Sequence, residues 1–304
     1  MRVVYSLPDA QPGDSKGRSR DSVVTIGAFD GIHRGHRAVL DSVRQAALDQ
    51  GRASVVVTFF PHPSVVLGYA EPFYLTSTEE KIVLLDAIGI DLLVVMPFTI
   101  ELSHTRAADY VSMLVEQLRM REVHVGYDFA FGYKREGNVD FLKRIGPEHG
   151  FNVREVEALS NDGESISSTD IRQALRQGDV ETAARWLGRP FRLSGMVVKR
   201  EEPDRSIELP AAQLDVWQDH AIPADGAYAG WAWVGNLKFK AMVSVGSKPR
   251  DIGKPLRTVE ARLLDFDRDI HGMNVALDFV ARQPTSKRTN EQTTNDQKPR
   301  HLSP

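Results

Sequence analysis

The sequence predicts an α/β protein in two parts: a Rossmann-like parallel sheet with helices on both faces, followed by a small antiparallel β-barrel. Segments typical of strands and helices alternate as far as residue 187. After residue 197, short apolar runs are separated by glycines, prolines and aromatic residues. A chain of 304 residues is long enough for two domains. We place these at residues 1–188 and 189–282, with a polar, disordered tail over 283–304.

The first part is organised around a strand, a glycine turn and a helix within residues 23–51. Val23–Ile26 is a β-branched apolar run typical of a buried strand, and it is interrupted at Gly27. A turn through Asp30 and Gly31 follows, and apolar residues then recur with helical spacing up to Gly51. A strand, a glycine turn and a helix in this order form a ready-made anion-binding site.

Two histidines lie three residues apart at the start of that helix. His33 and His36 should share one face, close to the positive end of the helix dipole, where imidazoles can donate hydrogen bonds to phosphate oxygens. Gly31 and Gly35 would let the backbone approach a ligand closely. A zinc site is disfavoured, because the chain has no cysteine and the pair lacks a third ligand. The Gly-x-Gly-x-x-Gly dinucleotide fingerprint is also absent.

The next strand, residues 53–60, ends at Pro61-His62-Pro63. The prolines fix His62 in an extended or turned segment at the carboxyl end of a strand, where ligands of α/β sheets bind. His62 is therefore either a ligand-binding residue or a structural loop residue. The pattern then predicts a helix over 76–87 capped by Ser77 or Thr78, a strand over 91–96, a helix over 105–119 and a strand over 122–125.

Two further segments indicate ligand binding. Residues 126–137 combine glycines, aromatic residues and a basic pair, so no regular element is expected there. This composition fits either a ligand loop at a strand end or an aromatic packing loop. Ser168 or Thr169 is expected to cap a helix that continues to Gly178, giving a second anion-binding N-terminus or a plainly capped helix. Arg172 is expected in the first turn, where a cation opposes the helix dipole and should face a ligand.

The composition restricts the class of protein. A net charge of −3 and a pI near 6.3 argue against non-specific nucleic-acid binding. No apolar run is long enough to cross a membrane, and the first twenty residues do not resemble a signal peptide. The absence of cysteine excludes disulfides and thiol catalysis. A cytoplasmic enzyme is expected, and no pattern predicts its oligomeric state.

The separate motifs together resemble the FMN adenylyltransferase module of bacterial bifunctional riboflavin kinase/FAD synthetases. The resemblance rests on Gly27–His36, Phe59–Pro63, Gly126–Gly137, Ile166–Arg172, Gly178–Glu181 and Leu187–Pro190, in the order of the family. It implies transfer of AMP from ATP to FMN with release of pyrophosphate, assisted by Mg²⁺. Relatives often carry a basic residue where this chain has Ser165, and this difference leaves the preferred nucleotide open.

The resemblance also implies roles for individual residues. His33, His36 and Arg172 would be catalytic. The nucleotide would be bound by Gly27, Ala28, Phe29, Asp30, Gly31, Gly35, Asp128, Gly132, Arg135, Ser167, Ser168 and Thr169. The flavin would lie against Phe60, His62 and Phe129. No residue is expected to bind a metal by itself.

The second part resembles the riboflavin kinase barrel of the same family, with changes at its chemistry. The family's Mg²⁺-binding threonine is Ala211 here and its asparagine is Gln213, and a methyl group cannot ligate a hard cation. Glu260 matches the family's general base, which makes it a relic or a surviving base. The sequence thus predicts an FAD synthetase without kinase activity. The alternatives are a nucleotidyltransferase for a modified flavin or another nucleotide such as CTP, and a non-catalytic flavin-binding regulator.

Overall fold

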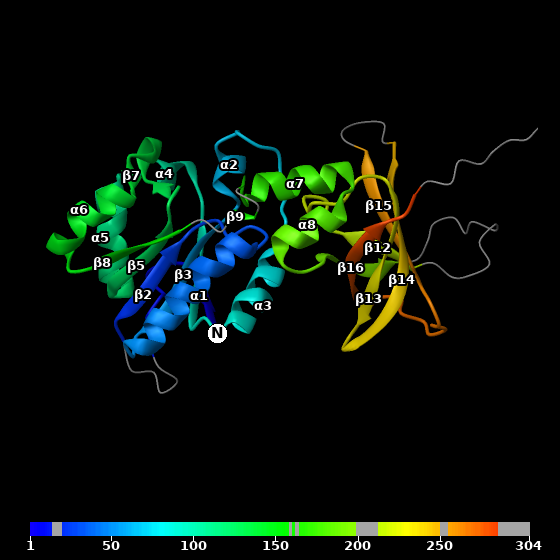
Figure 1. Ribbon diagram of the computed structural model, residues 1–304, viewed down its shortest axis with the longest axis horizontal. Coiled ribbons are helices and arrows are strands. Elements are labelled where there is room, and N and C mark those ends of the chain that lie inside the picture. Colours follow the sequence, from blue (N-terminus) through cyan, green and yellow to red (C-terminus); the bar gives the residue numbers. More distant parts are fainter. Residues whose placement is uncertain (14–19, 158–159, 162–163, 199–211, 250–254, 285–304) are drawn as a thin grey trace, which may run out of the picture.

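The computed structural model of the protein describes residues 1–13, 20–157, 160–161, 164–198, 212–249 and 255–284. Figure 1 shows two bodies, an α/β sheet and a β-barrel, with α7 and α8 between them. The predicted fold class is confirmed. Ala211 and residues 285–304 of the predicted tail lie outside the described residues.

The first body is a six-stranded sheet with the order β1-β4-β3-β2-β5-β8, in which every pairing is parallel. Its strands are β1 (Arg2–Val4), β2 (Ser22–Ile26), β3 (Ala53–Phe60), β4 (Leu92–Pro97), β5 (Met120–Gly126) and β8 (Asn152–Val156). After β2 the chain adds β3 and β4 on one side and β5 and β8 on the other. The order of the strands therefore reverses between β2 and β5, and ligands of open α/β sheets bind at such a point.

Helices cover both faces of the sheet. They are α1 (Arg34–Asp49), α2 (Pro63–Val66), α3 (Thr78–Ile88), α4 (Ile100–Ser103), α5 (Ala107–Leu118) and α6 (Val139–His149). Leu40 of α1 and Leu85 of α3 pack on the face that carries Val56, whereas α5 and α6 pack on the face that carries Val55 and Val57. Neighbouring strand residues point to opposite faces, so a strand covered on both sides is apolar throughout.

The second body is a closed antiparallel barrel with the order β11-β12-β15-β14-β13-β16. Its strands are β11 (Phe191–Val198), β12 (Ala212–Val216), β13 (Gly226–Val234), β14 (Leu237–Lys248), β15 (Leu256–Leu263) and β16 (Asn274–Arg282). The sequence pattern did not indicate β11 or β12. In β11 buried and exposed residues alternate, as expected of a strand with one face in the barrel interior.

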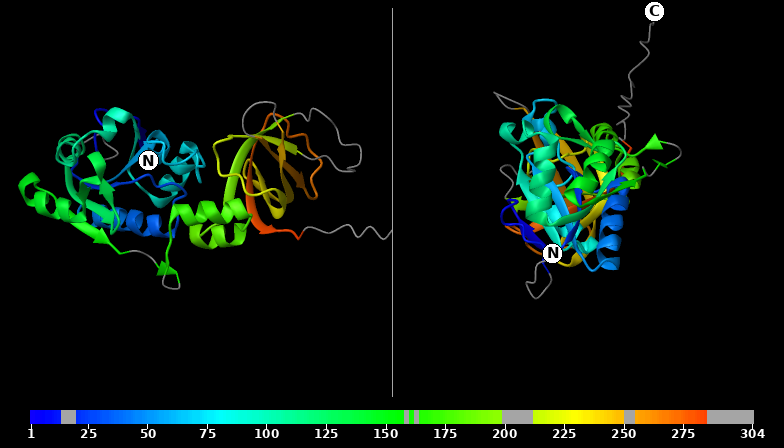
Figure 2. Two further views of the ribbon diagram at one scale, coloured as in Figure 1. Left: turned by 90° about the horizontal axis from the view of Figure 1, so that it is seen from above. Right: turned by 90° about the vertical axis from the view of Figure 1, so that its left-hand side faces the viewer.

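Two helices, α7 (Ser168–Gln177) and α8 (Val180–Leu187), connect the bodies (Figures 1 and 2). Ile171 and Leu187 belong to the same apolar core as Phe191 and Tyr228 of the barrel. The predicted boundary between residues 188 and 189 falls between α8 and β11. Because α7 and α8 share the core of the barrel, they join its interior to the ligand edge of the sheet.

Short elements lie in the remaining segments. They are β6 (Ala130–Phe131), the 3-10 turn η1 (Tyr133–Arg135), β7 (Gly137–Asn138), β9 (Ser160–Asn161) and β10 (Glu164–Ser165). The expectation that residues 126–137 contain no regular element is therefore wrong, since β6 pairs with β7. Each of these strands has only two residues, which is too short for the alternation that identifies a strand.

Candidate active site

The turn after β2 lies where the strand order reverses. Gly27 continues the sheet by donating its amide to the carbonyl of Val57 at 3.0 Å, and the chain then leaves the sheet. Three residues of the turn have positive φ: Phe29 (46°), Gly31 (84°) and Ile32 (39°). The turn delivers His33 to the N-cap of α1, so the first amides of the helix face the carboxyl edge of the sheet.

His33 and His36 lie against each other at this N-terminus. Their rings stack with centroids 3.7 Å apart, and His33 Nδ1 accepts the backbone amide of His36 at 3.3 Å. An Nδ1 that accepts a hydrogen bond leaves the proton of neutral His33 on Nε2. His36 Nδ1 is buried and has no hydrogen-bond partner among the described residues.

Burial keeps both imidazoles neutral. It lowers the pKa of His33 to about 4, although nearby Asp30 opposes the shift. Burial and the adjacent His33 hold the pKa of His36 well below its usual value. At neutral pH each ring is thus one N–H donor and one acceptor, and neither carries a positive charge. The neutral pair is therefore suited to hydrogen bonding with an anion and not to ion pairing with it.

Asp30 is turned into the protein. Its carboxylate, 3% exposed, accepts the amide of Leu75 at 3.0 Å and that of Thr76 at 3.1 Å. It also forms an ion pair with Arg172, whose Nη2 lies 2.5 Å from Oδ2. These contacts tie the turn to the segment before α3 and to α7. These contacts of the Asp30 carboxylate are structural. Its role in nucleotide binding stays a prediction.

The second helix N-terminus meets the first. The Oγ of Ser168 donates to the backbone carbonyl of Asp30 at 2.9 Å, which joins α7 to the turn before α1. The structure corrects the predicted cap: Ser167, not Ser168 or Thr169, is the N-cap and accepts the amide of Asp170. Thr169 is exposed beside it. Ser167 has the extended backbone that a cap requires, whereas Ser168 and Thr169 are already helical.

Arg172 also lies differently from the prediction. It is the fifth residue of α7, so it falls in the second turn and not in the first. Besides its ion pair with Asp30, its Nε donates to the carbonyl of Phe73 at 2.9 Å. The guanidinium therefore offsets the buried carboxylate and fixes the chain before α3, and its side chain remains 19% exposed.

The Pro-His-Pro segment ends the neighbouring strand. His62 caps the short helix α2, and its Nδ1 lies 2.7 Å from Ser64 Oγ. Burial lowers the pKa of His62 to about 4. Phe60, 40% exposed, faces Tyr74 and Trp217 with ring centroids 5.6 and 6.2 Å away. His62 is thus a structural cap as well as a residue at the ligand edge.

The loop after β5 is held mainly by packing. Phe129 stacks on Phe131 at 5.3 Å and is partly buried against the core under the sheet. A Cβ on Gly132 would lie 2.8 Å from backbone atoms of Ala107, so the loop fits closely over α5. Asp128 and Arg135 are exposed. These observations favour the packing-loop interpretation for Phe129 and Gly132, and Asp128 and Arg135 remain predicted nucleotide-binding residues.

In the barrel, the structure brings two of the predicted vestigial kinase residues together. Gln213 of β12 and Glu260 of β15 are directly opposite in the register of the two strands. Directly opposite residues of an antiparallel pair project from the same face of the sheet. The two residues predicted to be vestigial therefore lie side by side on one face of the barrel wall.

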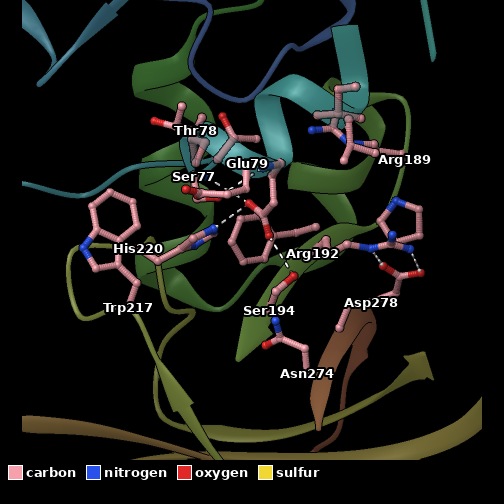
Figure 3. Close-up of a pocket in the computed structure, with 18 of the residues that line it drawn as sticks. Ser77, Thr78, Glu79, Arg189, Arg192, Ser194, Trp217, His220, Asn274 and Asp278 are labelled. Carbon is pink, nitrogen blue, oxygen red and sulfur yellow. Dashed lines mark hydrogen bonds and ion pairs between the residues drawn. The ribbon is translucent and has the colours of Figure 1, made fainter. Parts of the chain in front are cut away.

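A pocket of about 830 Å³ lies between the two bodies (Figure 3). Glu80 of α3 links them: its carboxylate accepts from Ser194 Oγ at 3.0 Å and lies 3.0 Å from His220 Nε2. Burial opposes ionisation of Glu80, but the interactions with His220, the Ser77 amide and the Ser194 hydroxyl together outweigh it and lower the pKa. Arg192 and Asp278 form a further ion pair at 2.7 Å. Two charged pairs, Glu80 with His220 and Arg192 with Asp278, thus lie in the lining, and the first of them connects the two bodies.

Sequence reasoning missed Lys81, Arg189 and His220. Lys81 lies in a predicted helix beside Glu79 and Glu80, where lysine is usually a solvated surface residue. Arg189 was part of a motif without an assigned role, and His220 stands in a segment without periodicity. No sequence signal distinguishes these buried polar residues from exposed ones.

The described residues do not form a metal site by themselves. No group of three or more His, Asp or Glu side chains among them could hold an ion. The Asp30 carboxylate, which interacts with His33, already accepts two amides and pairs with Arg172. Nor does any helix in the described part combine the length and apolarity needed to cross a lipid bilayer.

Comparison with known proteins finds a matching family for each of the two parts of the chain. Residues 15–170 match the family model described as FAD synthetase, and residues 187–292 match that of riboflavin kinase. The bifunctional riboflavin kinase/FMN adenylyltransferase of Listeria monocytogenes is 33% identical over 254 residues, covering 83% of this chain and 81% of that protein. The protein of the same description from Pseudomonas fluorescens is 31% identical over 280 residues, covering 92% and 88%.

A solved structure has the same architecture. It is described as a macrolide-efflux protein from Streptococcus pneumoniae, and it superposes with a TM-score of 0.84 at 27% identity. The match covers 96% of this chain and 94% of that one. The similarity therefore includes both bodies and their connection.

Proposed function

Since the chain belongs to the bifunctional riboflavin kinase/FMN adenylyltransferase family, we propose that it is an FAD synthetase that transfers AMP from ATP to FMN. The observation that carries the proposal is the meeting of two helix N-termini at the ligand edge, joined by the bond from Ser168 to Asp30 and lined by the stacked histidines. Helix N-termini, hydroxyl groups and imidazole N–H groups suit a triphosphate better than an uncharged ligand.

In the proposed reaction, an oxygen of the FMN phosphate attacks the α-phosphorus of ATP. The new P–O bond forms as the bond to the β-phosphate breaks, and pyrophosphate leaves. No covalent enzyme intermediate is needed, because the substrate supplies the nucleophile. Catalysis then consists of positioning and of stabilising charge on the phosphoryl oxygens. ATP enters as its Mg²⁺ complex, with the ion carried by the phosphates.

The histidines act in this scheme as neutral donors. The Nε2–H of His33 points from a ring whose Nδ1 is fixed by the amide of His36, so its orientation is set before the substrate binds. The amides of the first turn of α1 supply further donors. Ser167, Ser168 and Thr169 line the phosphate site on the side opposite the histidines. Arg172 holds the turn through its ion pair with Asp30, and the exposed part of its guanidinium faces the substrate.

We further propose that riboflavin phosphorylation is lost. The support is the pair of replacements at Ala211 and Gln213, the first of which removes a hydroxyl that could ligate Mg²⁺. Glu260 remains opposite Gln213 in the barrel. Phe60 and His62 are proposed to border the flavin, since both lie at the carboxyl end of β3.

The test is direct. Purified protein with FMN and MgATP should form FAD and pyrophosphate, whereas riboflavin and MgATP should give no FMN. His36→Ala should reduce turnover about 10²–10³-fold, the effect of losing one preorganised donor. Unchanged turnover in this variant would contradict the role of His36 as a donor to the phosphates.

A panel of ATP, CTP and GTP, read by product mass, separates an adenylyltransferase from a relative with another nucleotide preference. The absence of any transfer would favour a flavin-binding regulator.

A further inference from the structure

The backbone carbonyls of the turn before α1 are held by side chains from other elements. Lys81 Nζ donates to the carbonyl of Ala28 at 2.7 Å. Arg189 donates to the carbonyl of Gly31 at 2.7 Å and to that of Ile32 at 3.2 Å. Together with the bond from Ser168 to Asp30, these contacts fix the protein-facing side of the turn.

We infer that Lys81 and Arg189 are positioning residues for nucleotidyl transfer, which hold these carbonyls so that His33 and the first amides of α1 keep a fixed orientation toward the substrate. Neither side chain is assigned a contact with substrate. The inference rests on the proposed function for its catalytic consequence. Its structural part, the fixing of the turn, can be measured without any activity.

Lys81 holds the start of the turn from within the protein. It lies in α3 and is 8% exposed, and it also donates to Thr58 Oγ1 at 3.2 Å. Thr58 in turn donates to the same Ala28 carbonyl at 2.9 Å, so the three groups form a closed cluster. Burial lowers the pKa of Lys81 to about 8, and Asp30 opposes that shift. The ammonium is therefore mainly charged at pH 7, and charge-assisted hydrogen bonds are about twice as strong as neutral ones.

Arg189 holds the end of the turn from the side of the barrel. It stands between α8 and β11, two residues before the first barrel strand. Burial lowers the pKa of its guanidinium to about 10, so the group remains charged at neutral pH. Besides the carbonyl of Leu187, it contacts those of Gly31 and Ile32, the two residues before His33. A shift of this guanidinium would thus move the N-cap of α1.

The backbone conformation explains why such support is needed. Phe29 and Ile32 adopt positive φ values of 46° and 39°, a region that residues with a Cβ rarely occupy. Conformations of this kind are strained and persist only where the surroundings hold them. Removing a cation from the carbonyls releases the turn toward a relaxed conformation, in which the two imidazoles no longer face the same point.

The test uses the full-length protein and matched variants. Lys81→Met keeps most of the length of the side chain and removes its donor, and Lys143→Met makes the same change at an exposed lysine paired with Glu155. Arg189→Met removes both donors, whereas Arg189→Lys keeps a charge and one donor. For each variant we would measure kcat for FAD formation, the Kd of MgATP without FMN, the unfolding midpoint, and amide hydrogen exchange in residues 27–36.

Lys81→Met and Arg189→Met should lower kcat about 10–10²-fold, since a displacement near 1 Å can cost about 10²-fold. The Kd should change by less than about threefold, because the binding groups themselves remain, and a tenfold change would be about 1.4 kcal/mol. Exchange in 27–36 should rise in both variants, Arg189→Lys should recover part of kcat, and Lys143→Met should match the wild type.

Unchanged kcat, or unchanged exchange in 27–36, would overturn the inference. A loss of kcat that accompanies faster exchange throughout the chain would also overturn it, because the role would then be general stability. Absence of FAD formation by the wild type would contradict the proposed function instead. In that case the local exchange of Lys81→Met against Lys143→Met still decides whether the cation fixes the turn.

Discussion

Replacing Asp30 by asparagine should destabilise the protein strongly, although the side chain hardly changes in size. The Asp30 carboxylate is 3% exposed, accepts the amides of Leu75 and Thr76, and pairs with Arg172 at 2.5 Å. Breaking a buried ion pair by removing one partner costs about 3–5 kcal/mol. Arg172 is 19% exposed and asparagine keeps one acceptor oxygen, so the lower end, about 3 kcal/mol, is expected.

Urea unfolding followed by far-ultraviolet circular dichroism measures this loss. Asp41→Asn is the matched control, because Asp41 is half exposed and pairs with Arg37 four residues earlier on the surface of α1. Exposed pairs of this kind contribute about 0.3–0.5 kcal/mol. Asp30→Asn should therefore lower the free energy of unfolding several times more than Asp41→Asn. Equal effects within about 0.5 kcal/mol would refute the reasoning that Asp30 is the buried anchor of the turn.

Three further predictions concern the same turn and the helix beside it. The pKa of His33 is about 4 in the folded protein and near 6.5 when unfolded, so the unfolded chain binds more protons between these two values. The free energy of unfolding therefore falls as the pH drops, and the loss from His33 is about 2 kcal/mol at pH 5. His33→Asn should show a shallower pH dependence in urea unfolding. Gly31→Ala should cost about 2 kcal/mol in thermal unfolding, because φ is +84° and the new Cβ would lie 2.8 Å from Leu75 Cδ1. Gly51 has a φ of +63° and open space around it, so Gly51→Ala should cost about half as much. Ser77→Ala should cost about 1 kcal/mol in the same measurement by opening the capping box with Glu80, and an unchanged unfolding midpoint in this variant would contradict the role of the hydroxyl.

Local sequence patterns determined much of the fold. The strand expected over 53–60 coincides with β3, and the helix expected over 105–119 contains α5. Ser77 and Gly89 mark the ends of α3, as capping residues should. These elements are specified by neighbours along the chain: apolar periodicity, caps and breakers. The parallel sheet followed from the alternation of the elements, since parallel strands need crossovers.

Short or long-range features were decided only by the tertiary structure. The alternation of buried and exposed residues in β11 and β12 arises because one face of each strand lines the barrel interior and the other faces outward. The prediction that Ser168 or Thr169 caps α7 was wrong by one or two positions, because a run of serine and threonine offers several caps and the direction of the incoming chain selects Ser167.

The candidate site divides in the same way. The sequence by itself singled out His33, His36 and the segment 167–172, because glycine turns, caps and paired imidazoles are local signals. Only the tertiary structure decided that Ser168 meets the turn, that Arg172 pairs with Asp30, and that Lys81 is buried against Ala28. The physical reason is that a charged side chain becomes a buried structural group through partners far away in the chain, and local patterns carry no record of those partners.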